Sequence, residues 1–231
     1  MMQLKSIAVI VLLVGLSPAE QNRSIQNVSE FTDGNITGQV VLTPRSSGNR
    51  FTGGMYGRPN QSTSSGSSDD SVLVVLTGAE NAQPNIEKSP VILDQKNQQF
   101  IPSLLPVRQN QTVRIRNSDP VYHNVFSLSS PNKFDVGRRP KGEYLDVSFD
   151  EAGVVDVFCD IHSNMHAIIY VMPVNALQWV KIKSGDTFNL EAVPAGNYEI
   201  KIFALGYEER THSVEIQSGK TFDIGTITMN R

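Results

Sequence analysis

The chain has 231 residues, of which 39% are hydrophobic and 19% are charged, and its formal net charge is −3. This composition is that of a globular protein with room for one or two domains. The slight excess of negative charge gives no basic surface of the kind that binds nucleic acid, so we expect no nucleic-acid partner.

The N-terminus has the pattern of a secretory signal peptide. Lys5 precedes an apolar run from Ile7 to Leu16, and a Ser-Pro-Ala triplet follows at residues 17–19. A charged start, a short apolar run and small residues before a cleavage point are typical of export signals. The run is too short to span a bilayer. We therefore expect residues 1–19 to be removed, leaving a periplasmic or secreted chain from Glu20 with no membrane span.

Residues 20–70 are predicted to be a polar segment with a single strand. Apolar and polar residues alternate at 36–43, as in a half-buried strand. The following residues, 44–70, are rich in Ser, Gly and Asn and are typical of a loop or linker. The pattern leaves open which domain the strand joins, and pairing with the C-terminal module is one option.

Residues 71–173 contain many short apolar segments separated by turn residues. The first, residues 72–76, is a continuous apolar run that is typical of a strand buried on both faces. Pro102 and Pro106 restrict their segment to a sheet edge or a bulge. Further strands are expected at residues 91–95, 112–117, 121–128, 144–149, 154–158 and 167–172. Short strands, frequent turns and no helical periodicity predict an all-β sandwich.

Residues 129–142 are polar and are expected to form a loop. Three cationic residues lie near its end, Arg138, Arg139 and Lys141. A solvated loop is the simpler interpretation, and a docking surface for an acidic redox partner is the alternative.

The only cysteine of the chain, Cys159, lies in a Cys-x2-His-x2-Met sequence with His162 and Met165. A single cysteine in an exported chain suggests a thiol kept for chemistry rather than for a disulfide. Thiolate, imidazole and thioether are soft ligands that suit copper in both oxidation states. A second imidazole is available upstream at His123.

The segment from about Val91 to Pro173 resembles the cupredoxins, and in particular the amicyanin and plastocyanin branch. The resemblance rests on His123-Asn124-Val125, on the Cys–His–Met loop with its amicyanin-like spacing, and on the turn at 149–153. It implies a cupredoxin Greek-key β-sandwich over residues 71–173. It also implies one type 1 (blue) copper per chain, bound by the residues His123, Cys159, His162 and Met165, with Met165 as the weak axial ligand.

Two neighbours of these ligands are expected to have supporting roles, Asn124 from the resemblance and Ile161 from a departure from the family's pattern. Asn124 would bridge the histidine loop to the cysteine loop and polarise the thiolate. Ile161 stands where amicyanin and plastocyanin have proline, and its N–H is expected to donate to the sulfur of Cys159 and raise the reduction potential. His166 is expected to be an exposed strand residue rather than a ligand.

Residues 174–231 are predicted to form a second, smaller β-sandwich. Strands are expected at residues 179–182, 187–190, 198–203, 211–216 and 222–228. The sequences from Val193 to Ile200 and from Ala204 to Glu209 resemble carboxypeptidase-regulatory-like, transthyretin-like modules. The module contains no ligand cluster, and His212 is expected to be an exposed strand residue.

These patterns predict an exported one-electron carrier that exchanges electrons with another redox protein. The chain has only four histidines, too few for the additional copper sites of multicopper oxidases and nitrite reductases, so we expect no enzyme. The alternative is a non-redox binding or structural protein that uses a cupredoxin scaffold and an interaction module. A zinc site or a nucleophilic cysteine fits the methionine less well.

Overall fold

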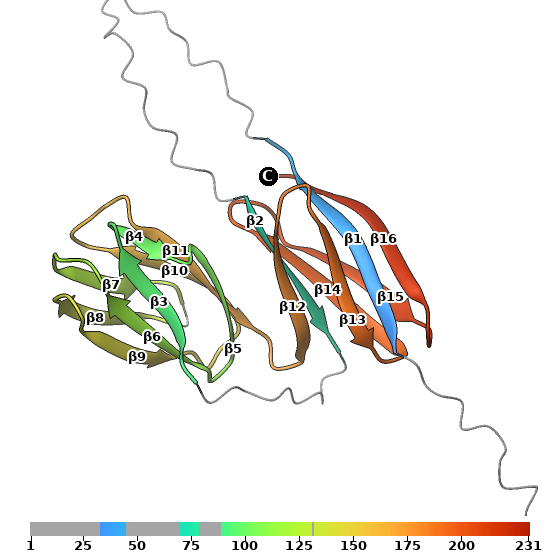
Figure 1. Ribbon diagram of the computed structural model, residues 1–231, viewed down its shortest axis with the longest axis horizontal. Helices are drawn as coiled ribbons and strands as arrows, with labels where there is room; N and C mark the ends of the chain where they lie inside the picture. Colours follow the sequence, from blue (N-terminus) through green and yellow to red (C-terminus); the bar gives the residue numbers. More distant parts are fainter. Residues whose placement is uncertain (1–32, 45–69, 79–88, 131) are drawn as a thin grey trace, which may run out of the picture. The chain divides into compact units, whose positions relative to one another are not determined.

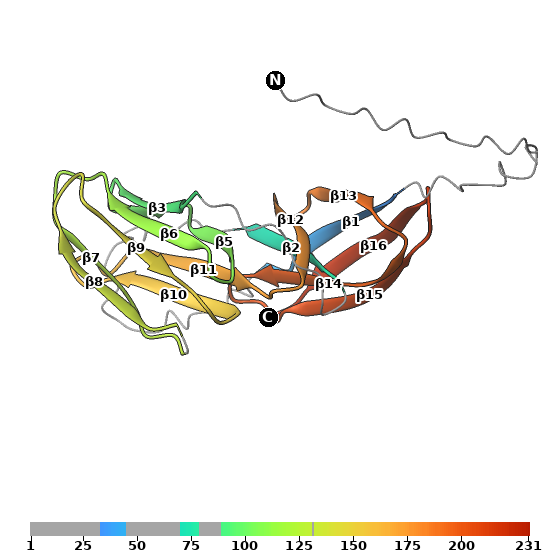
Figure 2. The ribbon, with the colours of Figure 1, turned by 90° about the horizontal axis from the view of Figure 1, so that it is seen from below.

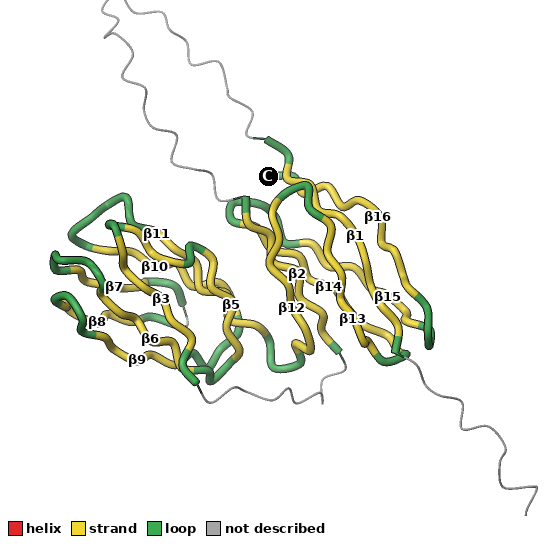
Figure 3. The backbone as a smooth tube through the Cα atoms, in the orientation of Figure 1, coloured by secondary structure: helices red, strands yellow, loops and turns green. Residues whose placement is uncertain are grey.

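The computed structural model describes residues 33–44, 70–78, 89–130 and 132–231 (Figure 1). These residues form strands and loops and no helix (Figure 3), which confirms the predicted all-β class. Accordingly, the described part of the chain has no helix long and apolar enough to cross a membrane. The predicted signal peptide at 1–19 and the linker at 45–69 lie outside the described residues.

The first sandwich contains two sheets. Its strands are β3 (Val91–Lys96), β4 (Gln99–Ile101), β5 (Leu104–Arg108), β6 (Thr112–Asn117), β7 (His123–Ser127), β8 (Phe134–Arg139), β9 (Tyr144–Ser148), β10 (Gly153–Cys159) and β11 (His166–Met172). One sheet has the order β4-β3-β6-β9, and the other has the order β5-β11-β10-β7-β8. Alternate residues of these strands, among them Val113, Ile115, Val155 and Val157, build one buried core.

Two features of this sandwich test the sequence predictions. Strand β5 pairs only with β11, which confirms that the segment with Pro102 and Pro106 lies at a sheet edge. The prediction of a loop at 129–142 is wrong in part, because residues 134–139 form strand β8, which pairs with β7. A register shift near Gly137, which has a φ of 70°, interrupts the alternation of inward-facing and outward-facing residues. The sequence therefore lacks the two-residue periodicity by which a strand is predicted.

The second sandwich also contains two sheets. Its strands are β1 (Gly34–Leu42), β2 (Ser71–Thr77), β12 (Ala176–Lys183), β13 (Thr187–Val193), β14 (Gly196–Ala204), β15 (Arg210–Ile216) and β16 (Thr221–Met229). They form a three-stranded sheet of order β13-β1-β16 and a four-stranded sheet of order β12-β2-β14-β15. Strand β1 therefore joins the C-terminal module, which was the option left open by the sequence.

The predicted domain boundary at residue 71 needs correction. Strand β2 was expected in the first sandwich, but it pairs with β12 and β14 of the second. The prediction that it is buried on both faces is confirmed: Val72 and Val74 lie in the core of the second sandwich, and Leu73 and Val75 lie in a separate cluster with Ile168 of β11. An apolar run predicts burial, but it does not specify which sheet provides the neighbours.

Candidate metal centre

Strand register brings Cys159 and His123 together. Strand β10 pairs with β7 so that Cys159 lies opposite Val125. His123 is two residues from Val125 on the same strand, so both side chains face the same side of the sheet. Val157, Val125 and Cys159 belong to one buried core cluster, as the spacing predicts, and His123 is completely buried. The sulfur and the imidazole therefore meet at the inner end of the sandwich.

The loop after β10 delivers the second imidazole. The Met165 N–H donates to the His162 carbonyl at 3.0 Å, which closes a turn between β10 and β11. His162 is half-buried, whereas Met165 is 1% exposed and lies in the same core cluster as Cys159. All four predicted ligands are thus placed by β7, by the end of β10 and by this one turn.

Three donor atoms converge at this point. The Nδ1 atom of His123 lies 3.6 Å from Cys159 Sγ, and the Nδ1 atom of His162 lies 3.8 Å from the same sulfur. The two Nδ1 atoms are 3.1 Å apart. All three donor atoms lie within 4.8 Å of one another. When His, Cys, Asp and Glu side chains of the described residues are considered together, these two histidines and the cysteine form the group that could hold a metal ion.

These separations fit a metal ion. A first-row ion such as zinc binds histidine nitrogen at about 2.0–2.1 Å and thiolate sulfur at about 2.3 Å, so donors at angles of about 100–120° lie about 3.1–3.8 Å apart. The three observed separations span that range. Two imidazoles and a thiolate with a nearby methionine are also the donor types of a blue-copper site.

The far side of the His123 ring is fixed by a carboxylate that the sequence patterns did not reveal. His123 Nε2 lies 2.9 Å from Asp119 Oδ2, and both side chains are buried. A proton on Nε2 donates to this carboxylate and leaves the lone pair of Nδ1 for a metal. The available signal was a carboxylate four residues before the first histidine, in a loop where no periodicity indicates where side chains point.

Asp119 also caps a turn of the opposite sheet. The Asn97 N–H donates to its Oδ1 at 2.6 Å, and the Gln98 N–H donates to its Oδ2 at 2.8 Å. These two residues connect β3 and β4 and have φ values of 56° and 55°. Burial alone would raise the pKa of the Asp119 carboxyl, but the hydrogen bonds from Gln98, His123 and Asn97 outweigh it and lower the pKa. The carboxylate is therefore stabilised in its ionised form.

The two predicted supporting roles are not seen in the geometry. Asn124 is buried, but its Oδ1 accepts no hydrogen bond from the described residues, so this oxygen forms no bridge to the cysteine loop. The Cys159 sulfur lies within hydrogen-bonding distance of the two imidazoles. In the described structure the Ile161 N–H does not donate to this sulfur. The turn is closed by the Met165 N–H instead, and the Ile161 side chain is 41% exposed.

The other two histidines lie outside the donor cluster. His166 Nε2 is 2.9 Å from Asp156 Oδ1, and its ring stacks on Phe158 with 4.8 Å between centroids. His166 is therefore half-buried rather than exposed, but it is no ligand. His212 lies on β15 as predicted, yet it is also half-buried, and its Nε2 has no partner among the described residues.

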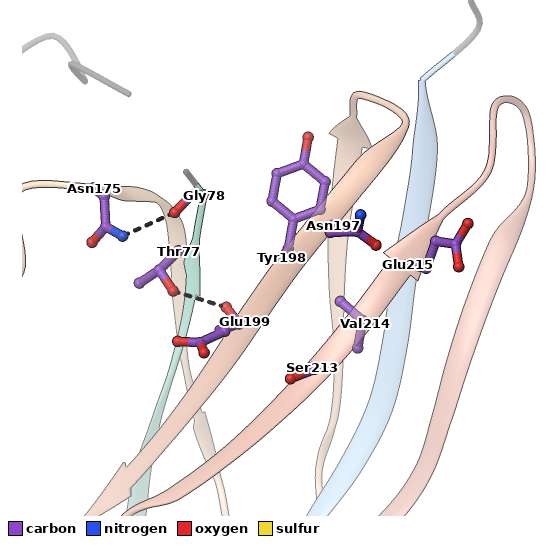
Figure 4. Close-up of a pocket in the computed structure, with 9 residues that line it drawn as sticks. All are labelled: Thr77, Gly78, Asn175, Asn197, Tyr198, Glu199, Ser213, Val214 and Glu215. Carbon is purple, nitrogen blue, oxygen red and sulfur yellow. Dashed lines mark hydrogen bonds between the residues drawn. The ribbon is translucent and has the colours of Figure 1, made fainter. Parts of the chain in front are cut away.

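A pocket of about 610 Å³ on the second sandwich is separate from this centre (Figure 4). Its lining consists of Thr77, Gly78, Asn175, Asn197, Tyr198, Glu199, Ser213, Val214 and Glu215. It contains no histidine or cysteine. Two of its polar groups already bond to the chain itself, from Asn175 to the Gly78 carbonyl and from Thr77 to the Glu199 carbonyl. The pocket therefore lacks the imidazole and thiol donors of the metal centre.

No family model matches the chain, and no curated protein matches it significantly. Among solved structures, a copper-containing nitrite reductase from Thermus scotoductus SA-01 is 24% identical, with a TM-score of 0.36 over 42% of this chain and 25% of the reductase. The chain thus spans a quarter of that enzyme.

Two smaller proteins are also similar. An amicyanin variant in its oxidized state is 21% identical, with a TM-score of 0.35 over 38% of this chain and 86% of amicyanin. A purple cupredoxin from Nitrosopumilus maritimus is 21% identical, with a TM-score of 0.32 over 36% of this chain and 99% of that protein. At TM-scores this low the likenesses carry no functional weight, and the function of the chain is inferred from its donor atoms.

Proposed function

We propose that the chain is a copper protein with one type 1 site, which carries single electrons to or from another redox protein outside the cytoplasm. The observation that carries this proposal is the convergence of two Nδ1 atoms and the Cys159 sulfur at 3.1–3.8 Å, with Met165 buried in the same cluster. When bound, copper supplies a centre that is oxidised and reduced by one electron.

The protein's own contribution is to hold the donors in place. The backbone of His123 is held by the pairing of β7 with β8, and its ring is held by Asp119. Cys159 is the last residue of a central strand and is 5% exposed. A donor set held in this way changes little between oxidation states, which favours rapid electron transfer.

The remaining chain supports a carrier rather than a copper enzyme. His166 is paired with Asp156 and His212 lies in the second sandwich, so the described residues provide no second histidine cluster for a further copper. The second sandwich is proposed to be a carboxypeptidase-regulatory-like interaction module. Export and cleavage before Glu20 remain part of the proposal.

A visible absorption spectrum with one equivalent of Cu(II) tests the proposal. We expect an intense thiolate-to-copper charge-transfer band in the wild type and none in Cys159→Ser. The matched control is Ser163→Ala, because Ser163 is an exposed residue of the same loop that supplies no donor atom. A colourless protein that retains Zn(II) in preference to copper would instead favour a zinc site, since zinc also binds thiolate and imidazole. A protein that retains neither metal would favour the non-redox binding protein.

A further inference from the structure

Strand β8 forms a free edge of the five-stranded sheet beside the metal centre. In the order β5-β11-β10-β7-β8, it pairs with β7 alone (Figure 2). The register places Arg139 opposite His123 and Arg138 opposite Asn124. Neighbouring strands lie about 4.8 Å apart. The two arginines therefore lie one strand away from the strand that carries the ligand His123.

The cationic side chains at the end of β8 that pairs with His123 and Asn124 are not fully neutralised by carboxylates of the protein. Arg138 and Lys141 are exposed, and neither side chain has an ion-pair or hydrogen-bond partner among the described residues. Arg139 donates to the Val136 carbonyl, and its ion pair is a long contact of 3.7 Å with the exposed Glu143. Both arginines of strand β6, in contrast, form bonds of 2.8 Å with aspartates. We call Arg138, Arg139 and Lys141 the cationic edge.

Protection of the sheet from aggregation does not account for this arrangement by itself. Arginine, lysine and proline on an edge strand do discourage pairing with other chains. That role would be served by charge anywhere along the strand. Here three cations lie at the end nearest His123, whereas the other end has one cation, Lys133, close in sequence to the carboxylate of Asp135, which accepts from the Gly137 N–H at 2.9 Å.

We propose that the cationic edge is the docking surface for a carboxylate-rich face of the redox partner, an inference that rests on the proposed electron transfer. The chain as a whole carries a net charge of −3 and would repel such a partner. A local positive surface beside the metal therefore selects the orientation in which the partner approaches the centre. Membrane surfaces are bound by clusters of about four to eight cations, more than this edge provides.

The surface is tested by binding, independently of copper. The metal-free full chain, labelled with ¹⁵N, is titrated with a hexaglutamate peptide at low ionic strength. We expect the largest amide shifts between residues 136 and 143, and we expect them to disappear in Arg138→Gln/Lys141→Gln. The control Lys183→Gln/Lys220→Gln removes the same charge from the second sandwich and should leave these shifts unchanged. Shifts that are spread over the surface would overturn the proposal, as would binding to phosphatidylglycerol vesicles without binding to the peptide.

The link to electron transfer is tested with small oxidants of opposite charge. The reduced copper protein gives one electron either to hexacyanoferrate(III) or to tris(phenanthroline)cobalt(III). At low ionic strength, Arg138→Gln/Lys141→Gln should lower the rate with the anion about three- to tenfold and raise it with the cation. Equal effects in the control pair would mean that only net charge matters and would refute the proposal. Failure to form the copper site would defeat the proposed function, while the peptide titration would still decide the docking surface.

Discussion

The buried Asp119 carboxylate should be worth several kilocalories per mole to the first sandwich. It accepts hydrogen bonds from the Asn97 and Gln98 amides and from His123. Asp119→Asn keeps the shape but replaces one acceptor oxygen by an NH2 donor, which must then face an N–H. Hydrogen bonds to charged groups contribute about 1.5–3 kcal/mol, and an unsatisfied buried donor costs about 1–3 kcal/mol. The expected loss in the free energy of unfolding is about 2–3 kcal/mol.

The assay needs a probe that lies in the first sandwich. The single tryptophan, Trp179, is on β12 and reports on the second sandwich. The buried thiol of Cys159 is the better probe, because it lies in the core of the first sandwich and becomes accessible to a thiol reagent when that sandwich unfolds. In metal-free protein, Asp119→Asn should lower the urea midpoint of thiol exposure by about 0.7–3 M, given a slope of about 1–3 kcal/mol per M.

The control is Asp146→Asn, which changes an exposed carboxylate that is paired with Arg114. Exposed ion pairs are screened by solvent and contribute little to stability, so the midpoint of this variant should move much less. Equal shifts in the two variants would show that the Asp119 network contributes no more than an ordinary surface pair, and the proposed support of His123 would then be wrong.

Other contacts give three further predictions. Gln98→Gly should stabilise the first sandwich by about 0.5–1 kcal/mol, because a left-handed residue in a two-residue hairpin is replaced by glycine; a lower midpoint of thiol exposure would contradict this. Burial of Asp94 is outweighed by its bonds to Arg116 and Ser118, which lower its pKa. Its contribution to stability is therefore present above about pH 4 and is lost as the pH falls through the lowered pKa, so wild type and Asp94→Asn should converge in acid unfolding titrations. Met165→Leu should keep the copper charge-transfer band and raise the reduction potential measured by voltammetry, because the axial ligand tunes that potential; an unchanged potential would remove Met165 from the centre.

The convergence of Cys159, His162 and Met165 could be predicted from the sequence because it depends on local spacing, whereas His123 was expected from the resemblance. Residues 155, 157 and 159 alternate on one strand, and a single short turn carries His162 and Met165. The position of β2 could not be predicted, because an apolar strand does not specify its neighbours. The role of Asp119 was not predicted for a similar reason. The groups that donate hydrogen bonds to its carboxylate belong to a turn of the other sheet and to strand β7, and no local sequence pattern indicates that they lie close together.

Both sheets of the first sandwich hold the centre, and this determines which substitutions can change it. Cys159 and His123 lie on paired strands of one sheet, and Asp119 fastens His123 to a turn of the other. Movement between the sheets would therefore stretch the bond from Asp119 to His123 before it separated His123 from Cys159. His162 has no such anchor, because its turn is closed by one backbone hydrogen bond. Substitutions that change the backbone conformation of the 160–164 loop should alter metal affinity with little effect on unfolding, whereas substitutions at Asp119 should alter both. A centre with two fixed donors and one adjustable donor can thus be tuned through its loop without loss of the fold.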